Sequence, residues 1–113
     1  MKGRPVLIVV WAGFSPRARA CAREVEAFRR EQPGLQVVGV NLDGSEKQMD
    51  AACRELGLTW AQFNDGLGWA NRFARRWGVR KVPTVFVVDR QGRLLGWGGD
   101  EGWRELAAAA LQN

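Results

Sequence analysis

The stretch VVWAGFSPRARACAREV, from Val9 to Val25, changes from an apolar strand to a helix within a few residues, and this change decides the fold. The β-branched run from Val6 to Trp11 is typical of a central strand that is covered on both faces. Ser15 is a favourable N-cap, and Pro16 follows at the first helical position, where a missing N–H costs nothing. We therefore predict a buried strand followed directly by a helix that begins after Ser15.

Apolar residues recur along this helix at the spacing of one buried face, and Pro33-Gly34 ends it. The rest of the chain continues the alternation of strands and helices. The expected strands are residues 35–42, 84–88 and 94–97, and the expected helices are residues 46–56, 65–77 and 101–111. The order β-α-β-α-α-β-β-α predicts an α/β sandwich with a central mixed four-stranded sheet flanked by helices.

Length and charge limit the classes of protein and partner. The chain has 113 residues, enough for a single domain, and no apolar run long enough to span a membrane. Its 17 basic and 12 acidic residues give a net charge of +5, but the signs are interleaved. We therefore expect a monomer with a protein or peptide partner, for which an acidic partner is one option, and neither nucleic-acid binding nor membrane insertion. Because Met1 lies so close to the first strand, we expect residues 1–113 to be one domain cut from a longer parent.

The set of potential ligands and nucleophiles is small. The chain has no histidine, and its only cysteines are Cys21 and Cys53. Metals that need imidazole ligands and serine–histidine catalysis are therefore excluded within this chain. Two distant cysteines form neither a zinc site nor a disulfide framework. We expect no metal and no cofactor.

Two segments resemble the TlpA/ResA-like thiol–disulfide oxidoreductases, which have the thioredoxin fold. In that family the strand and helix are joined by W-A-x-W-C-P-P-C-R. Here Trp11-Ala12, Pro16 and Arg19 match this pattern, and Phe14 replaces the second tryptophan. The segment WGVRKVPTVFVVDRQGRLL, residues 77–95, resembles the family signature G-V-x-x-V-P-T-x-F-x-x-D-x-x-G.

The resemblance extends from about residue 5 to residue 111 and implies a thioredoxin-like sandwich. Residues 58–60 and the helix before Asp65 fit the insert helix that distinguishes this branch from plain thioredoxin. Relatives are commonly extracytoplasmic and tethered to a membrane, which implies such a parent here. The sequence itself has no targeting signal, so its location stays unknown.

The departure from the family lies at the reactive cysteines, which correspond to Ser15 and Ala18. Disulfide exchange needs an attacking thiolate and a second thiol that resolves the mixed disulfide. Neither position has a sulfur atom, so we predict a redox-inactive domain. Three alternatives stay open: a one-cysteine route through Cys21, stabilisation of a glutathione thiolate by Ser15, and a cysteine-free variant of an active reductase. Both cysteines fall on apolar helix faces and are more simply explained as hidden core residues.

A groove that binds a peptide does not need the reactive cysteines and can therefore be present without them. The resemblance implies that the Val82–Pro83 bond is cis, faces the reactive site and presents backbone groups to an extended peptide. Arg17, Arg80 and Lys81 would add positive charge to the free N–H groups of the helix start, which favours anions. Most of the six tryptophans are expected in the core, with Trp69 as a possible exposed contact. The predicted peptide or anion site comprises Trp11, Phe14, Ser15, Pro16, Arg17, Arg80, Lys81, Val82, Pro83 and Thr84.

Overall fold

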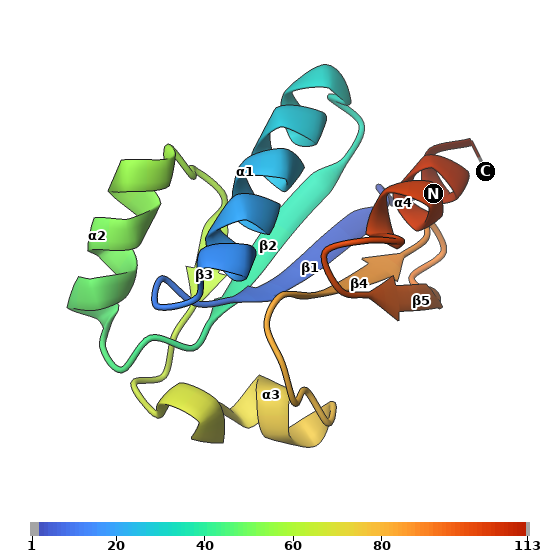
Figure 1. The fold of residues 1–113 in the computed structure, drawn as a ribbon. Coiled ribbons are helices and arrows are strands. Elements are labelled where there is room, and N and C mark those ends of the chain that lie inside the picture. The colour runs from blue at the N-terminus through green and yellow to red at the C-terminus, as the bar shows by residue number, and fades with distance from the viewer. Residues whose placement is uncertain (1–2, 113) are drawn as a thin grey trace.

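The computed structural model describes residues 3–112 and consists of a mixed sheet with helices on both faces (Figure 1). The strand order is β3-β2-β1-β4-β5. Strand β1 pairs parallel with β2 and antiparallel with β4, while β3 and β5 form the two edges. The strands are β1 (Val6–Trp11), β2 (Gln36–Asn41), β3 (Ala61–Phe63), β4 (Thr84–Val88) and β5 (Leu94–Gly98). The predicted thioredoxin-like α/β sandwich is confirmed.

The sheet has five strands, one more than the sequence predicted. The additional strand β3 pairs parallel with Val38–Val40 of β2. It is only three residues long, so it has too few positions to show the apolar alternation by which a strand is recognised.

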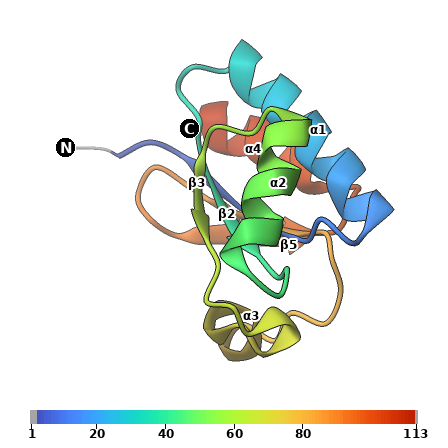
Figure 2. The same ribbon diagram turned by 90° about the vertical axis from the view of Figure 1, so that its left-hand side faces the viewer.

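Three helices cover one face of the sheet, which we call the first face. Among the residues that the structure describes, the opposite, second face is covered only by a short helix. Helices α1 (Pro16–Glu31), α2 (Glu46–Leu56) and α4 (Trp103–Gln112) lie above the sheet in Figure 1, and α3 (Arg72–Arg76) lies below it. The view in Figure 2 shows α1 and α2 on one side of β2 and β3, with α3 apart from them. No helix within residues 3–112 is both long enough and apolar enough to cross a membrane.

The predicted helix over residues 65–77 is wrong. That segment forms a short 3₁₀ helix η1 (Gly68–Ala70) and then the five-residue α3. Gly66 and Gly68 have positive φ angles of 76° and 56°, which break a regular helix. Asn71 then leaves helical geometry and caps α3, because its side chain accepts a hydrogen bond from the N–H of Ala74.

Alternation along the strands divides the core into two parts. Leu7, Val9 and Trp11 face α1, α2 and α4 and belong to the larger cluster. Val10 and Phe86 face the other way and pack with Ala74 of α3 in a smaller cluster. Since α3 is so short, part of the apolar second face has no helix over it.

The prediction that the tryptophans other than Trp69 lie in the core is wrong for Trp77 and Trp97. Trp11, Trp60 and Trp103 are buried. Trp69, Trp77 and Trp97 are exposed. The helical spacing of residues 67–77 suggested a buried stripe that included Leu67 and Trp77, but the broken helix leaves both of them at the surface.

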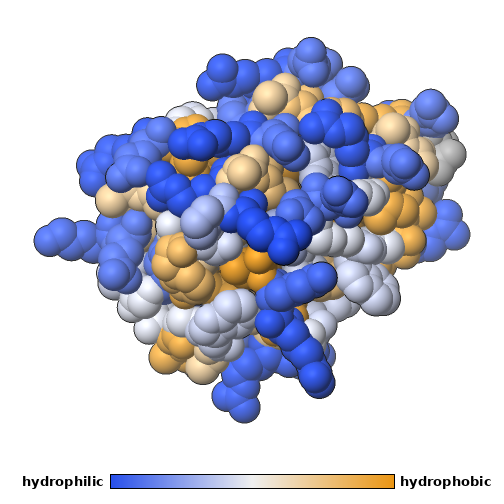
Figure 3. Space-filling model, in the orientation of Figure 1, coloured by the Kyte–Doolittle hydropathy of each residue, from blue (hydrophilic) through white to orange (hydrophobic). Residues whose placement is uncertain are grey.

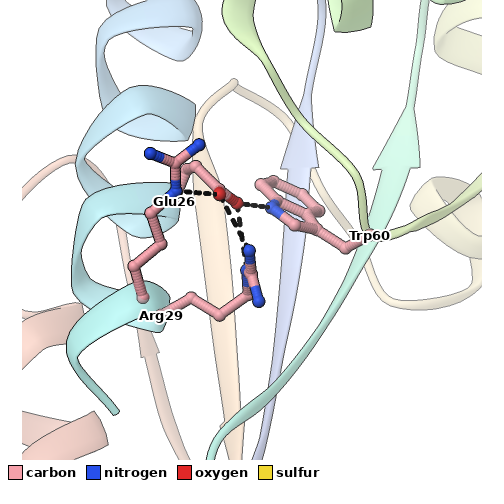
Figure 4. Close-up of polar contacts among 4 residues, drawn as sticks. Glu26, Arg29 and Trp60 are labelled. Atoms are coloured by element: carbon pink, nitrogen blue, oxygen red, sulfur yellow. Dashed lines mark hydrogen bonds and ion pairs between the residues drawn. The ribbon is translucent and has the colours of Figure 1, made fainter. Parts of the chain in front are cut away.

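A buried carboxylate ties α1 to the segment before β3 (Figure 4). Glu26 accepts a hydrogen bond of 2.7 Å from the indole N–H of Trp60. It also accepts hydrogen bonds from Arg29 and Arg30 at 2.8 Å. These donors, Arg29 first, lower the pKa of Glu26 from 4.5 to about 2, so the side chain is ionised at neutral pH.

Candidate functional site

The start of α1 has the geometry predicted for it. Ser15 is the N-cap, and its Oγ accepts a hydrogen bond of 3.1 Å from the N–H of Ala18. Ala18 is fully buried, whereas Pro16 is exposed at the first helical position. Pro16 has no N–H, and the N–H of Ala18 already donates to the Ser15 hydroxyl. In the first turn of the helix, within the described residues, this leaves only the N–H of Arg17 without a protein acceptor. The helix start is therefore a weaker anion site than the sequence suggested.

The loop before this helix is held by a residue that sequence reasoning missed. Buried Asp43 accepts the N–H of Gly13 on both carboxylate oxygens, at 3.1 and 2.9 Å. Asn41 donates a further hydrogen bond of 2.9 Å to Asp43. A Cβ at Gly13 would lie 3.0 Å from Asp43 Oδ2 and from the Ala52 Cβ, a tight contact that favours glycine here. The position of Asp43 just after a buried strand was the available signal.

Phe14 and Trp69 form an exposed aromatic pair beside the start of α1. Their ring centroids are 6.3 Å apart, and Phe14 is 56% exposed. Trp69 is thus an exposed residue, consistent with the contact foreseen for it. Trp11, by contrast, is completely buried and donates its indole N–H to Gln62 Oε1 at 3.0 Å. It cannot contact a ligand at the surface, so its inclusion in the predicted binding set is wrong.

The three cations of the predicted site are not equivalent. Arg17 forms two hydrogen bonds of 2.9 and 2.8 Å with Asp100, and this pairing is the main reason why the pKa of Asp100 is lowered. Lys81 also contributes to that lowering. Arg80 and Lys81 are exposed, and neither forms an ion pair within residues 3–112. Three cations against one carboxylate leave two net positive charges.

The Val82–Pro83 peptide bond is cis. Pro83 and Thr84 are buried and Val82 is half-buried. The Thr84 hydroxyl donates a hydrogen bond of 2.8 Å to the carbonyl of Lys81, which fixes the turn into β4. This turn presents Arg80 and Lys81 beside the first residue of the strand.

A groove of about 720 Å³ opens next to this turn on the second face of the sheet. We call it the aromatic groove. Three of its residues, Arg80, Lys81 and Thr84, belong to the predicted set, whereas no residue from 11 to 18 lines it. The other lining residues, which the prediction missed, are Trp77, Gly78, Val79, Phe86, Leu94, Trp97, Gly98 and Gly99.

Both cysteines are free thiols, but they differ in accessibility. Cys21 is 1% exposed, and burial is the main cause that raises its pKa to about 12. Cys53 is half-buried rather than hidden, which corrects the expectation for it, and its pKa is also raised by burial. Neither thiol has the lowered pKa of a reactive cysteine. No cluster of potential metal ligands occurs within residues 3–112.

We expect Ellman's reagent to leave Cys21 unlabelled in the folded chain and to label Cys53 slowly. The reason is that the reagent reacts with accessible thiolates, and burial suppresses both accessibility and ionisation at Cys21. The matched control is Cys53→Ala, which should show no labelling until denaturant is added. Fast labelling of the folded Cys53→Ala variant would show that Cys21 is reactive and would revive the one-cysteine route.

Known proteins resemble this chain in sequence and in fold. A family model described as thioredoxin-like matches residues 3–94. The thiol:disulfide interchange protein HelX of Rhodobacter capsulatus is 29% identical over 93 residues, which are 82% of this chain and 51% of HelX. The thiol:disulfide interchange protein DsbE of Escherichia coli is 30% identical over 92 residues, which are 80% of this chain and 47% of DsbE. The chain thus spans about half the length of these relatives.

The similarity in structure covers nearly the whole chain. The crystal structure of a putative thiol:disulfide interchange protein DsbE from Chlorobium tepidum superimposes with a TM-score of 0.77. The superposition covers 96% of this chain and 81% of the other at 24% sequence identity.

Proposed function

This chain belongs to the thioredoxin-like family, and we propose that it is a redox-inactive member that binds an extended segment of a partner protein beside Val82–Pro83. HelX and DsbE are named thiol:disulfide interchange proteins, but the present chain has no pair of cysteines separated by two residues. Without that pair, the proposed role of the domain is to bind a partner through its surface.

The lack of a thiolate supports redox inactivity. The Ser15 hydroxyl is un-ionised at neutral pH and is used as the helix cap, and Ala18 has no sulfur. Cys21 lies one turn further along α1, but it is buried and its pKa is raised to about 12. No group at this site can attack a disulfide and then be released by a neighbouring thiol.

The aromatic groove is the observation that carries the binding proposal. It lies next to the Val82–Pro83 turn, is open to solvent, and combines apolar walls with two exposed cations. Concave apolar surfaces with a few placed polar groups are the usual form of binding sites. An extended peptide can lie along such a groove and satisfy its own backbone groups by hydrogen bonds to exposed main chain.

Selection from a displayed library of random peptides tests binding. We expect the selected peptides to shift the backbone amide signals of Val82, Thr84, Gly98 and Gly99 first in NMR titrations. In parallel, the chain should match the no-protein blank in reductant-driven insulin reduction. Peptide-induced shifts confined to other regions would refute the proposed site. Turnover of insulin that survives replacement of both cysteines by alanine would refute redox inactivity.

A further inference from the structure

The aromatic groove owes its openness to the shortness of α3. Trp77 follows the last residue of α3, and its ring lies 5.8 Å from that of Phe86 on the sheet. Trp97 of β5 is paired with Phe86 across the two strands, with ring centroids 6.3 Å apart, and is 64% exposed. Two large aromatic side chains thus border the groove while half or more of their surface meets solvent. Exposed apolar patches of this kind mark interaction sites.

The groove changes character along its length. Strand register pairs Phe86 with Trp97 and Val88 with Leu94, so Leu94 lies at the end of β4 that is far from Pro83. Thr84, Lys81 and Arg80 lie at the near end, and the three aromatic rings lie between the two ends. One end is therefore cationic and the other apolar. The distance from Thr84 to Val88 is about 13 Å, the rise of four strand residues.

The segment that forms α3 and leads into β4 is positively charged. From Gly66 to Val88 the sequence has five basic residues and no acidic residue. Figure 3 shows hydrophilic side chains around much of the outline of the molecule, including the lower edge, where α3 lies in the same view. A second copy of this chain would bring the same cations against one another in a two-fold contact, which is unfavourable. The charge instead complements an acidic partner.

We propose that the aromatic groove binds a short linear segment of an acidic protein, with a carboxylate at Arg80 and Lys81 and a large apolar side chain between Trp77 and Trp97. This inference rests on the proposed function and specifies the chemistry of its ligand. An extended segment advances about 3.3 Å per residue, so the acidic and apolar residues are about two to four positions apart in the ligand. Tryptophan and arginine are the residue types that most often dominate binding energy.

Single-stranded nucleic acid also combines negative charge with rings that stack on tryptophan. It carries a charge on every nucleotide, however, and therefore needs cations along the whole length of its groove. Here the cations that line the groove lie at one end, and Leu94 makes the other end apolar. The observations favour a protein segment.

The test uses a synthetic peptide of about nine residues, long enough to span the groove when extended. It carries two glutamates, followed three positions later by phenylalanine and valine. We expect it to shift the indole signals of Trp77 and Trp97 in NMR titrations of the full chain. Trp97→Ala should weaken binding about tenfold or more, as at an interface hot spot, and Lys81→Glu about threefold or more. Trp69→Ala and Lys47→Glu are the matched controls, because both residues are exposed and lie outside the groove, and Lys47 lies on α2, outside the basic segment from Gly66 to Val88. Both variants should bind as the unmodified chain does.

Several outcomes would overturn the inference and leave the proposed function intact. One is binding that shifts the amides of Val82 and Thr84 but is unaffected by Trp97→Ala. Others are equal binding of a peptide with lysine in place of glutamate, or of one with serine in place of phenylalanine and valine. Stronger binding of oligothymidylate would replace the acidic protein with nucleic acid as the ligand. If neither this peptide nor any selected peptide shifts Val82 and Thr84, the proposed function itself fails.

Discussion

Replacing Glu26 with alanine is expected to lower the free energy of unfolding by about 3 kcal/mol. The substitution leaves the indole N–H of buried Trp60 without its acceptor, and an unsatisfied buried donor costs about 1–3 kcal/mol. It also removes the carboxylate that Arg29 and Arg30 share. The expected loss lies at the low end for broken buried ion pairs because Arg30 is largely exposed and can be hydrated. Urea denaturation followed by far-ultraviolet circular dichroism measures the change.

Glu24→Ala is the matched control, since Glu24 is exposed on the same helix and forms no ion pair within the described part of the chain. Its effect should stay within about 0.5 kcal/mol. Equal stability of the two variants would show that the contacts of Glu26 make no net contribution to the free energy of unfolding.

The same carboxylate should make the fold sensitive to acid. Its folded-state pKa is lowered from 4.5 to about 2, so its contribution to stability is present above pH 4.5 and is lost as the pH falls toward 2. Glu26→Gln keeps an acceptor for Trp60 but cannot titrate. We therefore expect the difference in stability between the unmodified chain and Glu26→Gln to shrink over this pH range. A constant difference would mean that Glu26 does not have a lowered pKa.

The first half of the fold could be predicted because local signals and tertiary packing agree there. The apolar run of β1, the Ser15 cap and the apolar face of α1 all indicate the same structure, and the structure has all three. Residues 65–77 gave conflicting signals. Their apolar spacing fits a helix, but Gly66, Gly68 and Asn71 interrupt it, and the backbone preference of these three residues outweighs the apolar pattern.

The candidate site was predicted only where a sequence motif marks it. Arg80, Lys81 and Thr84, which line the aromatic groove, were in the predicted set because they adjoin Val82-Pro83. Trp77 and Trp97 were missed, since large apolar residues at regular spacing normally indicate a core and only the three-dimensional structure shows that no helix covers them. Pairing between Arg17 and Asp100, 83 positions apart, is likewise a tertiary contact that no local pattern reveals.

Introducing two cysteines as Ser15→Cys with Ala18→Cys is expected to convert the chain from one without dithiol activity to one that forms a reversible disulfide and reduces insulin. The Ser15 side chain already lies over the first turn of α1, toward residue 18, because its Oγ is 3.1 Å from the Ala18 nitrogen. A sulfur at residue 15 would therefore lie close to one at residue 18, within the roughly 7 Å between Cα atoms that a disulfide allows. The helix start and exposed Arg17 favour the thiolate form at residue 15. Mass spectrometry with and without reductant, followed by the insulin assay, measures both properties.

The control for this variant is Ser15→Cys with Ala20→Cys, in which five residues of helix rise about 7.5 Å and exceed the reach of a disulfide. Both variants lose the serine cap, at a cost of about 0.5–2 kcal/mol. Only the first adds a sulfur at fully buried residue 18, which costs about 1–3 kcal/mol more. Circular dichroism must therefore show a folded chain before redox activity is compared. A folded Ser15→Cys, Ala18→Cys chain that forms no disulfide in oxidising buffer would show that residues 15 and 18 do not correspond to the reactive cysteines of the family. We expect the disulfide, and with it insulin reduction, only in the first variant, because Ser15 caps α1 and its side chain reaches the backbone of Ala18, whereas Ala20 lies further along the helix.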